Sequence, residues 1–301
     1  MGTTLAMVLL MTAAADGPQK IDDTPVVMTT AEAMSIPRPA PDRRIAYGPA
    51  PQQFGELRLP DGPGPHPVAI VLHGGCWLSE YDLGYISGLA AALADAGVAT
   101  WSLEYRRVGD DGGGWPGTFL DVGLGADHLR SLAADFGLDL GRVVTVGHSA
   151  GGHLALWLAA RPGLAPGDEL RGADPLPVAG VVALAGIADL AAYAAPDGCG
   201  AAVAPLLGGP PDQVPDRVRR ASPIELVPLG VPQHLVVGAL DPIVPPVHVR
   251  RYAEAAAAAG DAVEVVVVPA AGHFEPTAPD REAFVPVLAA VRAAVGPVEG
   301  E

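Results

Sequence analysis

Val-Val-Thr-Val-Gly-His-Ser-Ala-Gly-Gly occupies residues 143–152 of the chain. A short run of β-branched residues ends in Gly-x-Ser-x-Gly, and an apolar, alanine-rich stretch follows at once. Strand, sharp turn and helix in this order are typical of a nucleophile elbow. Such a turn lets a base reach the serine hydroxyl and turns a helix N-terminus toward developing negative charge. The segment therefore predicts an α/β fold with Ser149 as nucleophile.

The pattern on both sides of this segment supports an α/β architecture. From residue 54 onward, strand-like and helix-like stretches alternate. Besides the strand before Ser149, we expect strands at 54–59, 68–72, 98–103, 178–184, 234–237 and 263–268, and helices at 84–96, 119–136, 150–160, 247–259 and 281–295. This alternation predicts one catalytic domain, 54–301, with a mainly parallel central sheet and helices on both faces.

Three further segments carry weaker patterns. Residues 1–15 contain an apolar stretch and small residues like those of a signal peptide, but no Lys or Arg precedes them. Both a cytoplasmic and a secreted location therefore stay open, and the stretch is shorter than the roughly 20 residues of a membrane span. Residues 16–53 are proline-rich and predict an arm that is extended over the domain or partly disordered; it has no assigned chemistry, although its side chains are expected to affect the shape of the pocket. The insertion at 187–231 is expected to form a lid or one wall of a pocket.

Charge and cysteine content narrow the possible partners. The 301 residues carry a net charge of −16, which argues against binding to nucleic acid or an anionic membrane surface. Cys76 and Cys199 lack the spacing of a zinc site, so we expect no metal site. A disulfide between them stays open, because both fall in loops near the same edge of the predicted sheet. The oligomeric state is also left open.

A serine nucleophile needs a base and a carboxylate that orients it. His273 follows the strand at 263–268 and Asp241 follows the strand at 234–237, so both fall at the carboxyl edge of the sheet, where Ser149 lies. An aspartate before proline can also be a simple turn former, and Asp189 is the alternative carboxylate. The sequence predicts a triad of Ser149, Asp241 and His273.

The segment 73–77, His-Gly-Gly-Cys-Trp, directly follows the strand at 68–72. Glycines at this place let backbone amides approach a substrate oxygen closely. We expect the amides of Gly75, Cys76 and Ala150 to form an oxyanion hole.

Several neighbouring side chains receive structural or pocket roles. His73 is interpreted as structural, and Trp77 as either a pocket wall or a packing residue. His148 is a further pocket candidate, although packing is the simpler reading for it and for His153. His66 and His248 are expected to be exposed to solvent.

Four segments of the chain resemble those of a known family. The loop at 73–77, Glu-Tyr-Arg-Arg at 104–107, Gly-Gly-Trp-Pro at 113–116 and the elbow through His153 resemble the α/β-hydrolase superfamily, in particular BD-FAE-type bacterial esterases and kynurenine formamidase. The likeness extends from about Tyr47 to the C-terminal helix. It implies a cofactor-free serine hydrolase with Ser149, Asp241 and His273 as catalytic residues. Cys76 replaces the third glycine of the hormone-sensitive-lipase loop, which argues against that group.

The resulting functional prediction is a serine carboxylesterase that cleaves small esters through an acyl-enzyme. An arylformamidase acting on N-formylkynurenine, or another amide hydrolase, is the alternative within the enzymes. A non-catalytic binding member of the fold is the alternative from another class.

Overall fold

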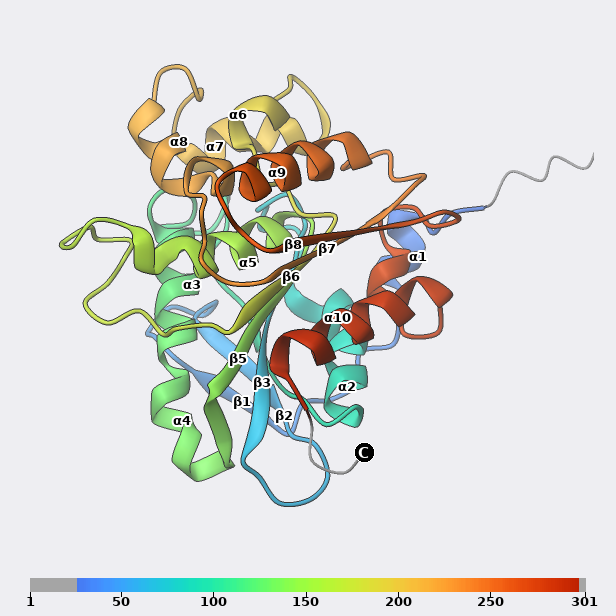
Figure 1. Ribbon diagram of the computed structural model, residues 1–301. Coiled ribbons are helices and arrows are strands. Elements are labelled where there is room, and N and C mark those ends of the chain that lie inside the picture. Colours follow the sequence, from blue (N-terminus) through green and yellow to red (C-terminus); the bar gives the residue numbers. More distant parts are fainter. Residues whose placement is uncertain (1–25, 298–301) are drawn as a thin grey trace, which may run out of the picture.

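An eight-stranded sheet runs through the computed structural model, which describes residues 26–297 (Figure 1). Its strands are β1 Arg43–Ala46, β2 Phe54–Arg58, β3 His66–Leu72, β4 Ala99–Leu103, β5 Leu138–His148, β6 Gly180–Leu184, β7 Gln233–Gly238 and β8 Val263–Val268. They follow the order β1-β2-β4-β3-β5-β6-β7-β8. The pairs β1–β2 and β2–β4 are antiparallel, and all other neighbours are parallel. The predicted mainly parallel sheet is confirmed.

Helices cover both faces of the sheet. They are α1 Thr30–Met34, α2 Ser87–Asp95, α3 Gly117–Asp127, α4 Leu129–Phe136, α5 Ala150–Ala160, α6 Leu190–Tyr193, α7 Val203–Leu207, α8 Pro215–Ala221, α9 Pro246–Ala258 and α10 Val285–Val295, with short 3₁₀ turns between some of them. In Figure 1, α2 and α10 lie on one side of the sheet and α3, α4 and α5 on the other. Helices α6, α7 and α8 gather at one end of the molecule, within the 187–231 insertion.

Two apolar layers hold the helices to the sheet. Ile70 and Val71 are successive residues of β3 that point to opposite faces, and both are fully buried. Val71 shares a layer with Leu89 of α2 and Val291 of α10, whereas Ile70 shares the other layer with Leu154 of α5. Each such side chain contributes about 1.5–3 kcal/mol on burial. Burial on both faces explains why the central strands are almost continuously apolar.

Two elements lie in the 16–53 arm, where the sequence predicts none. α1 begins with a capping box, in which the Glu32 amide donates to Thr29 Oγ1 (3.2 Å) and the Thr29 amide to Glu32 Oε2 (2.8 Å). β1 pairs along its whole length with β2. The prediction of an extended or partly disordered arm is wrong for α1, which is helical, whereas β1 is extended and lies on the domain as an edge strand. Both elements are too short for hydrophobic periodicity to reveal. The signal-like residues 1–15 lie outside the described part.

Three predicted helices are divided. The helix expected at 119–136 breaks at His128 into α3 and α4. The helices expected at 84–96 and 281–295 each begin with a 3₁₀ turn, Leu83–Ile86 and Glu282–Phe284. These differences move no element from one face of the sheet to another.

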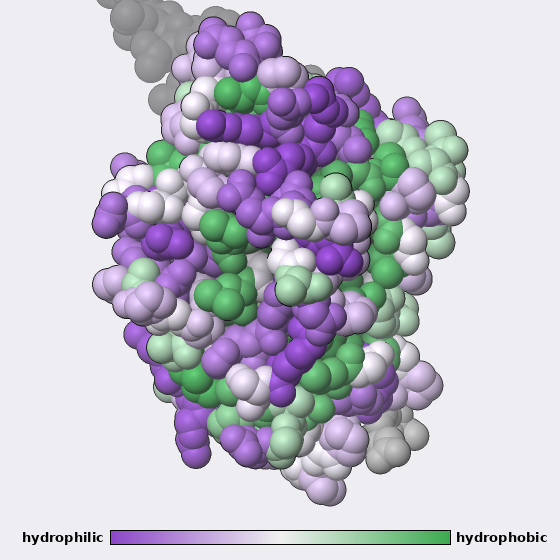
Figure 2. Space-filling view, turned by 90° about the vertical axis from the view of Figure 1, so that its left-hand side faces the viewer, coloured by the Kyte–Doolittle hydropathy of each residue, from purple (hydrophilic) through white to green (hydrophobic). Residues whose placement is uncertain are grey.

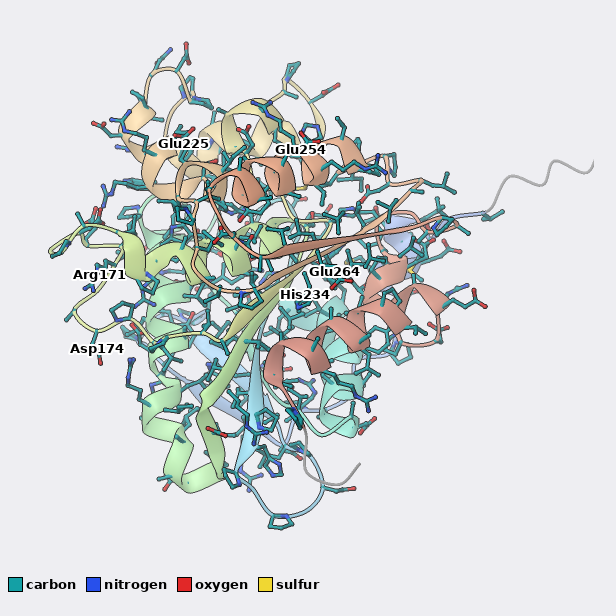
Figure 3. All side chains as sticks on the ribbon, in the orientation of Figure 1. Arg171, Asp174, Glu225, His234, Glu254 and Glu264 are labelled. Carbon is teal, nitrogen blue, oxygen red and sulfur yellow. A yellow bond between two sulfur atoms is a disulfide. The ribbon has the colours of Figure 1, made fainter. Side chains whose placement is uncertain are left out.

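One face of the molecule is mostly polar. Figure 2, seen from the left-hand side of Figure 1, shows hydrophilic residues over most of this face and hydrophobic ones in small groups between them. The edge strand β8 also carries charge: Glu264 Oε2 lies 3.1 Å from Nδ1 of His234 on β7, and the two residues are labelled in Figure 3. Charged side chains on an edge strand discourage pairing with other chains. Among residues 26–297, no helix has the length and apolar character needed to cross a membrane.

Candidate active site

Ser149 lies on a strained turn between β5 and α5. Its φ of 57° and ψ of −120° are rare for residues other than glycine, and such strain clusters at active sites. The turn requires the flanking glycines, because a Cβ on Gly147 would collide with the Gly151 carbonyl and a Cβ on Gly151 with the Leu72 carbonyl. The Ser149 amide donates to the Leu184 carbonyl of β6 (2.8 Å). The backbone thus fixes the serine at the carboxyl end of the sheet.

His273 and Asp241 form a buried hydrogen-bonded pair. His273 Nδ1 lies 2.7 Å from Asp241 Oδ2, and each residue is 4% exposed. The other oxygen, Oδ1, accepts the amides of Ile243 and Val244, each at 2.8 Å. Oδ1 is thus occupied by two backbone amides, and Oδ2 accepts the imidazole Nδ1–H. Because the ring proton lies on Nδ1, Nε2 is left to accept a proton.

Asp189, the alternative carboxylate, has another role. It caps α6 by accepting the Ala192 amide (3.0 Å), and its Oδ2 lies 3.3 Å from Arg251. These contacts leave Asp241 as the carboxylate that orients His273.

Ser149 and His273 line one cavity of about 640 Å³. The side chains of these two residues are not hydrogen-bonded to each other in the described part of the chain. Contacts of this kind are often looser before substrate binds. Among the described residues, no Lys or Arg lines the cavity, and Asp197 is its single carboxylate. Residues 192–200 of the insertion form part of its wall.

The 73–77 loop packs directly against the elbow. A Cβ on Gly74 would lie 2.6 Å from the His148 carbonyl oxygen and 3.0 Å from Ser149 Cβ. Only glycine permits this approach, which brings the loop beside the serine.

The three residues after Gly74 all have positive φ: 94° at Gly75, 54° at Cys76 and 57° at Trp77. Within residues 26–297, the amides of Gly75 and Cys76 have no hydrogen-bond acceptor. Ala150 is the first residue of α5, so its amide has no partner inside the helix. Among the described residues these three amides therefore have no backbone or side-chain acceptor, and Gly75 and Cys76 line the cavity.

A chain of buried hydrogen bonds joins the 73–77 loop, the turn that carries Ser149 and the segment that carries His273. The Gly74 amide donates to Tyr85 Oη (2.6 Å), Tyr85 Oη lies 2.9 Å from His148 Nδ1, and His148 Nε2 lies 2.9 Å from the His273 carbonyl oxygen. Burial and the nearby His273 hold the pKa of His148 well below its usual range, so its ring is neutral. Its Nε2–H must then donate to the carbonyl, and Nδ1 accepts the tyrosine proton.

Trp77 packs in the core and does not line the cavity. It is fully buried, and its Nε1–H donates to His153 Nδ1 (3.1 Å). His153 Nε2 in turn donates to the Ala221 carbonyl (2.9 Å). Burial lowers the pKa of His153 to about 4, so this ring is neutral as well. Of the two roles left open for Trp77, the structure shows packing.

His73 stabilises the 73–77 loop through a ring contact and a hydrogen bond. Its ring stacks on Tyr105 with centroids 4.4 Å apart, and its Nε2 lies 3.1 Å from Glu104 Oε1. Burial raises the pKa of Glu104, but His73 and the Arg107 guanidinium outweigh this effect and hold it below its usual range. The structural interpretation of His73 agrees with these contacts.

Cys76 and Cys199 form a disulfide, with Cα atoms 5.1 Å apart. The sequence left this pairing open, and the structure contains the bond. It joins the 73–77 loop to the insertion at a point where both border the cavity.

Two histidines are less exposed than the sequence predicts. His66 and His248 are half-buried rather than exposed, and His248 lines the cavity against Tyr193, with ring centroids 5.5 Å apart. Tyr85 is a functional candidate that carries no motif. The described residues contain no cluster of His, Cys, Asp and Glu that could hold a metal ion.

The sheet topology and this order of serine, aspartate and histidine define an α/β-hydrolase fold. The chain belongs to the BD-FAE family, whose family model matches residues 57–255. The predicted resemblance is confirmed. The matched segment includes Ser149 and Asp241, whereas His273 and the N-terminal arm lie outside it.

Named relatives agree with this assignment. The chain is 31% identical over 245 residues to esterase LipC of Mycobacterium tuberculosis, covering 77% of this chain and 59% of LipC. It is 31% identical over 114 residues to the isoprenylcysteine α-carbonyl methylesterase ICME of Arabidopsis thaliana, covering 38% of this chain and 26% of ICME. The chain thus spans less than two thirds of the length of either relative.

Solved structures share the fold. A truncated carbohydrate esterase from gut microbiota is 24% identical with a TM-score of 0.73, covering 84% of this chain and 95% of that one. Esterase B from Lactobacillus rhamnosis is 21% identical with a TM-score of 0.73, covering 88% and 90%.

Proposed function

We propose that this protein is a serine hydrolase that cleaves small carboxylic esters. The observation that carries the proposal is the buried His273–Asp241 pair, 2.7 Å apart, beside a cavity that it shares with Ser149 on its strained turn. A hydrogen-bonded base and carboxylate next to a turn-mounted serine are the parts that acyl transfer requires. The esterase relatives support the same reaction class.

In the proposed mechanism, Ser149 Oγ attacks the acyl carbon and its proton passes to His273 Nε2. Asp241 accepts the Nδ1–H and stabilises the imidazolium that forms. The free amides of Gly75, Cys76 and Ala150 donate to the oxyanion. His273 then returns the proton to the leaving alcohol, and a water molecule, activated by the same base, releases the acid from the acyl-enzyme.

The cavity favours an ester over N-formylkynurenine. That formamide is an amino-acid zwitterion at neutral pH: Asp197 at the cavity can pair with its α-ammonium group, but no Lys or Arg among the described residues lines the cavity to pair with its α-carboxylate. The test compares kcat/KM for p-nitrophenyl butyrate and for N-formylkynurenine in the same preparation. Faster turnover of the formamide would replace the esterase by an arylformamidase.

The same assay separates catalysis from binding alone. Ester hydrolysis by the wild type that disappears in Ser149→Ala supports the proposed function. Equal rates in the two proteins would favour a binding member of the fold with a contaminating esterase.

A further inference from the structure

The N-terminal arm contributes to the wall of the cavity. Thr30 and Met34 of α1 line the same cavity as Ser149, although α1 lies outside the segment matched by the family model. We propose that Met34 is a specificity-determining residue that limits the length of the ester chain that the cavity accepts. This inference rests on the proposed esterase function and names a residue in a segment whose side chains could not be placed from the sequence.

The carboxylate of Glu275 connects the N-terminal arm to the segment that carries His273. Glu275, which is 7% exposed, accepts the Met28 amide through Oε1 and the Gly272 amide through Oε2 (2.9 Å). Gly272 immediately precedes His273. The position of the arm is therefore fixed relative to His273, which lines the same cavity.

Further contacts hold the arm on the domain. A Cβ on Gly272 would lie 2.8 Å from Val27 Cβ, which shows how closely the arm covers this glycine. Ala33 is fully buried, and Arg38 forms an ion pair with Asp82 (3.2 Å). Because the arm is held before, within and after α1, its side chains have defined places at the cavity.

Met34 has the properties that such a wall requires. It is half-buried, packs against the apolar layer that contains Leu89, and borders the cavity at the same time. Three heavy atoms lie beyond its Cβ, so Met34→Ala opens space at the cavity, whereas Met34→Trp fills it. One methylene in an apolar pocket changes kcat/KM by roughly 10- to 200-fold.

The experiment measures kcat/KM for p-nitrophenyl butyrate, hexanoate and octanoate. Met34→Ala should raise the octanoate-to-butyrate ratio about tenfold, and Met34→Trp should lower it about tenfold. Met28→Ala is the matched control, because it makes the same change on the same arm, away from the cavity, and retains the backbone amide that contacts Glu275. An unchanged ratio in both Met34 variants, or an equal shift in Met28→Ala, would overturn the proposal.

A binding measurement keeps this test separate from the proposed function. In a Ser149→Ala background, isothermal titration with the same esters should give a tenfold change in the octanoate-to-butyrate affinity ratio on Met34→Ala. If the wild type hydrolyses no ester, the proposed function fails, and the titration alone decides the role of Met34. If the enzyme is active but neither ratio moves, only the inference about Met34 fails.

Discussion

Tyr85→Phe tests whether the buried hydrogen-bond chain holds the catalytic loops together. The Tyr85 hydroxyl accepts the Gly74 amide at 2.6 Å and lies 2.9 Å from His148 Nδ1, and the residue is 2% exposed. Phenylalanine retains the ring and removes the hydroxyl. The Gly74 amide and His148 Nδ1 then remain buried without partners.

The expected magnitude follows from these two lost partners. Each buried unsatisfied group costs about 1–3 kcal/mol, so the free energy of unfolding should decrease by about 2–6 kcal/mol. The melting temperature should fall by roughly 2 °C for each kcal/mol. Gly74 precedes the proposed oxyanion donors, and a displacement of about 1 Å can cost 10²-fold in rate. We expect kcat to fall about 10- to 10²-fold with little change in KM.

The assay combines urea denaturation with steady-state hydrolysis of p-nitrophenyl butyrate. Tyr252→Phe is the matched control, since this buried hydroxyl donates to Gln233 Oε1 (2.7 Å) on β7, outside the cavity. The control should lose stability but keep its kcat. A wild-type kcat in Tyr85→Phe, or an equal loss of kcat in both variants, would refute the positioning role.

Three further predictions concern the carboxylate, pH and the disulfide. Asp241→Asn should lower kcat about 10⁴-fold by disturbing the imidazole tautomer, whereas Asp189→Asn should retain most activity in the same assay, and comparable losses would contradict the assignment. Because burial lowers the pKa of His153 from 6.5 to about 4, the unfolded chain binds more protons than the folded one within this window. The free energy of unfolding should therefore fall with decreasing pH by up to about 1.4 kcal/mol per unit. Urea titrations of His153→Gln should lack this contribution, and an identical pH slope would argue against a neutral His153. Reduction of the Cys76–Cys199 bond should cost about 2–5 kcal/mol, measured as a lower melting temperature in reductant, and an unchanged value would indicate that the bond is absent.

The core of the site could be predicted from the sequence because its signals are local. The strand and helix around Ser149 show in the hydrophobic pattern, and glycines mark the turn that joins them. Asp241 and His273 follow strands directly, and parallel strands bring such positions to one edge. The hydrogen bond between these two residues agrees with that logic.

The remaining features depend on contacts between distant segments. Tyr85 has no motif, and its role emerges only where three loops meet. The strand Arg43–Ala46 has four residues and is mostly exposed, so no periodicity marks it. The place of Met34 at the cavity depends on the preceding segment, where Glu275 accepts the Met28 amide across a sequence separation of 247 residues. The pairing of Cys76 with Cys199 likewise requires the folded loops.

The most direct test of the central claim is intact-mass analysis after treatment with a fluorophosphonate, followed by peptide mapping. The account predicts one adduct per chain on Ser149 in the wild type, none in Ser149→Ala, and greatly slowed labelling in Asp241→Asn. An adduct on another residue, or no adduct on a wild-type protein that hydrolyses esters, would contradict the assignment of Ser149 as the nucleophile.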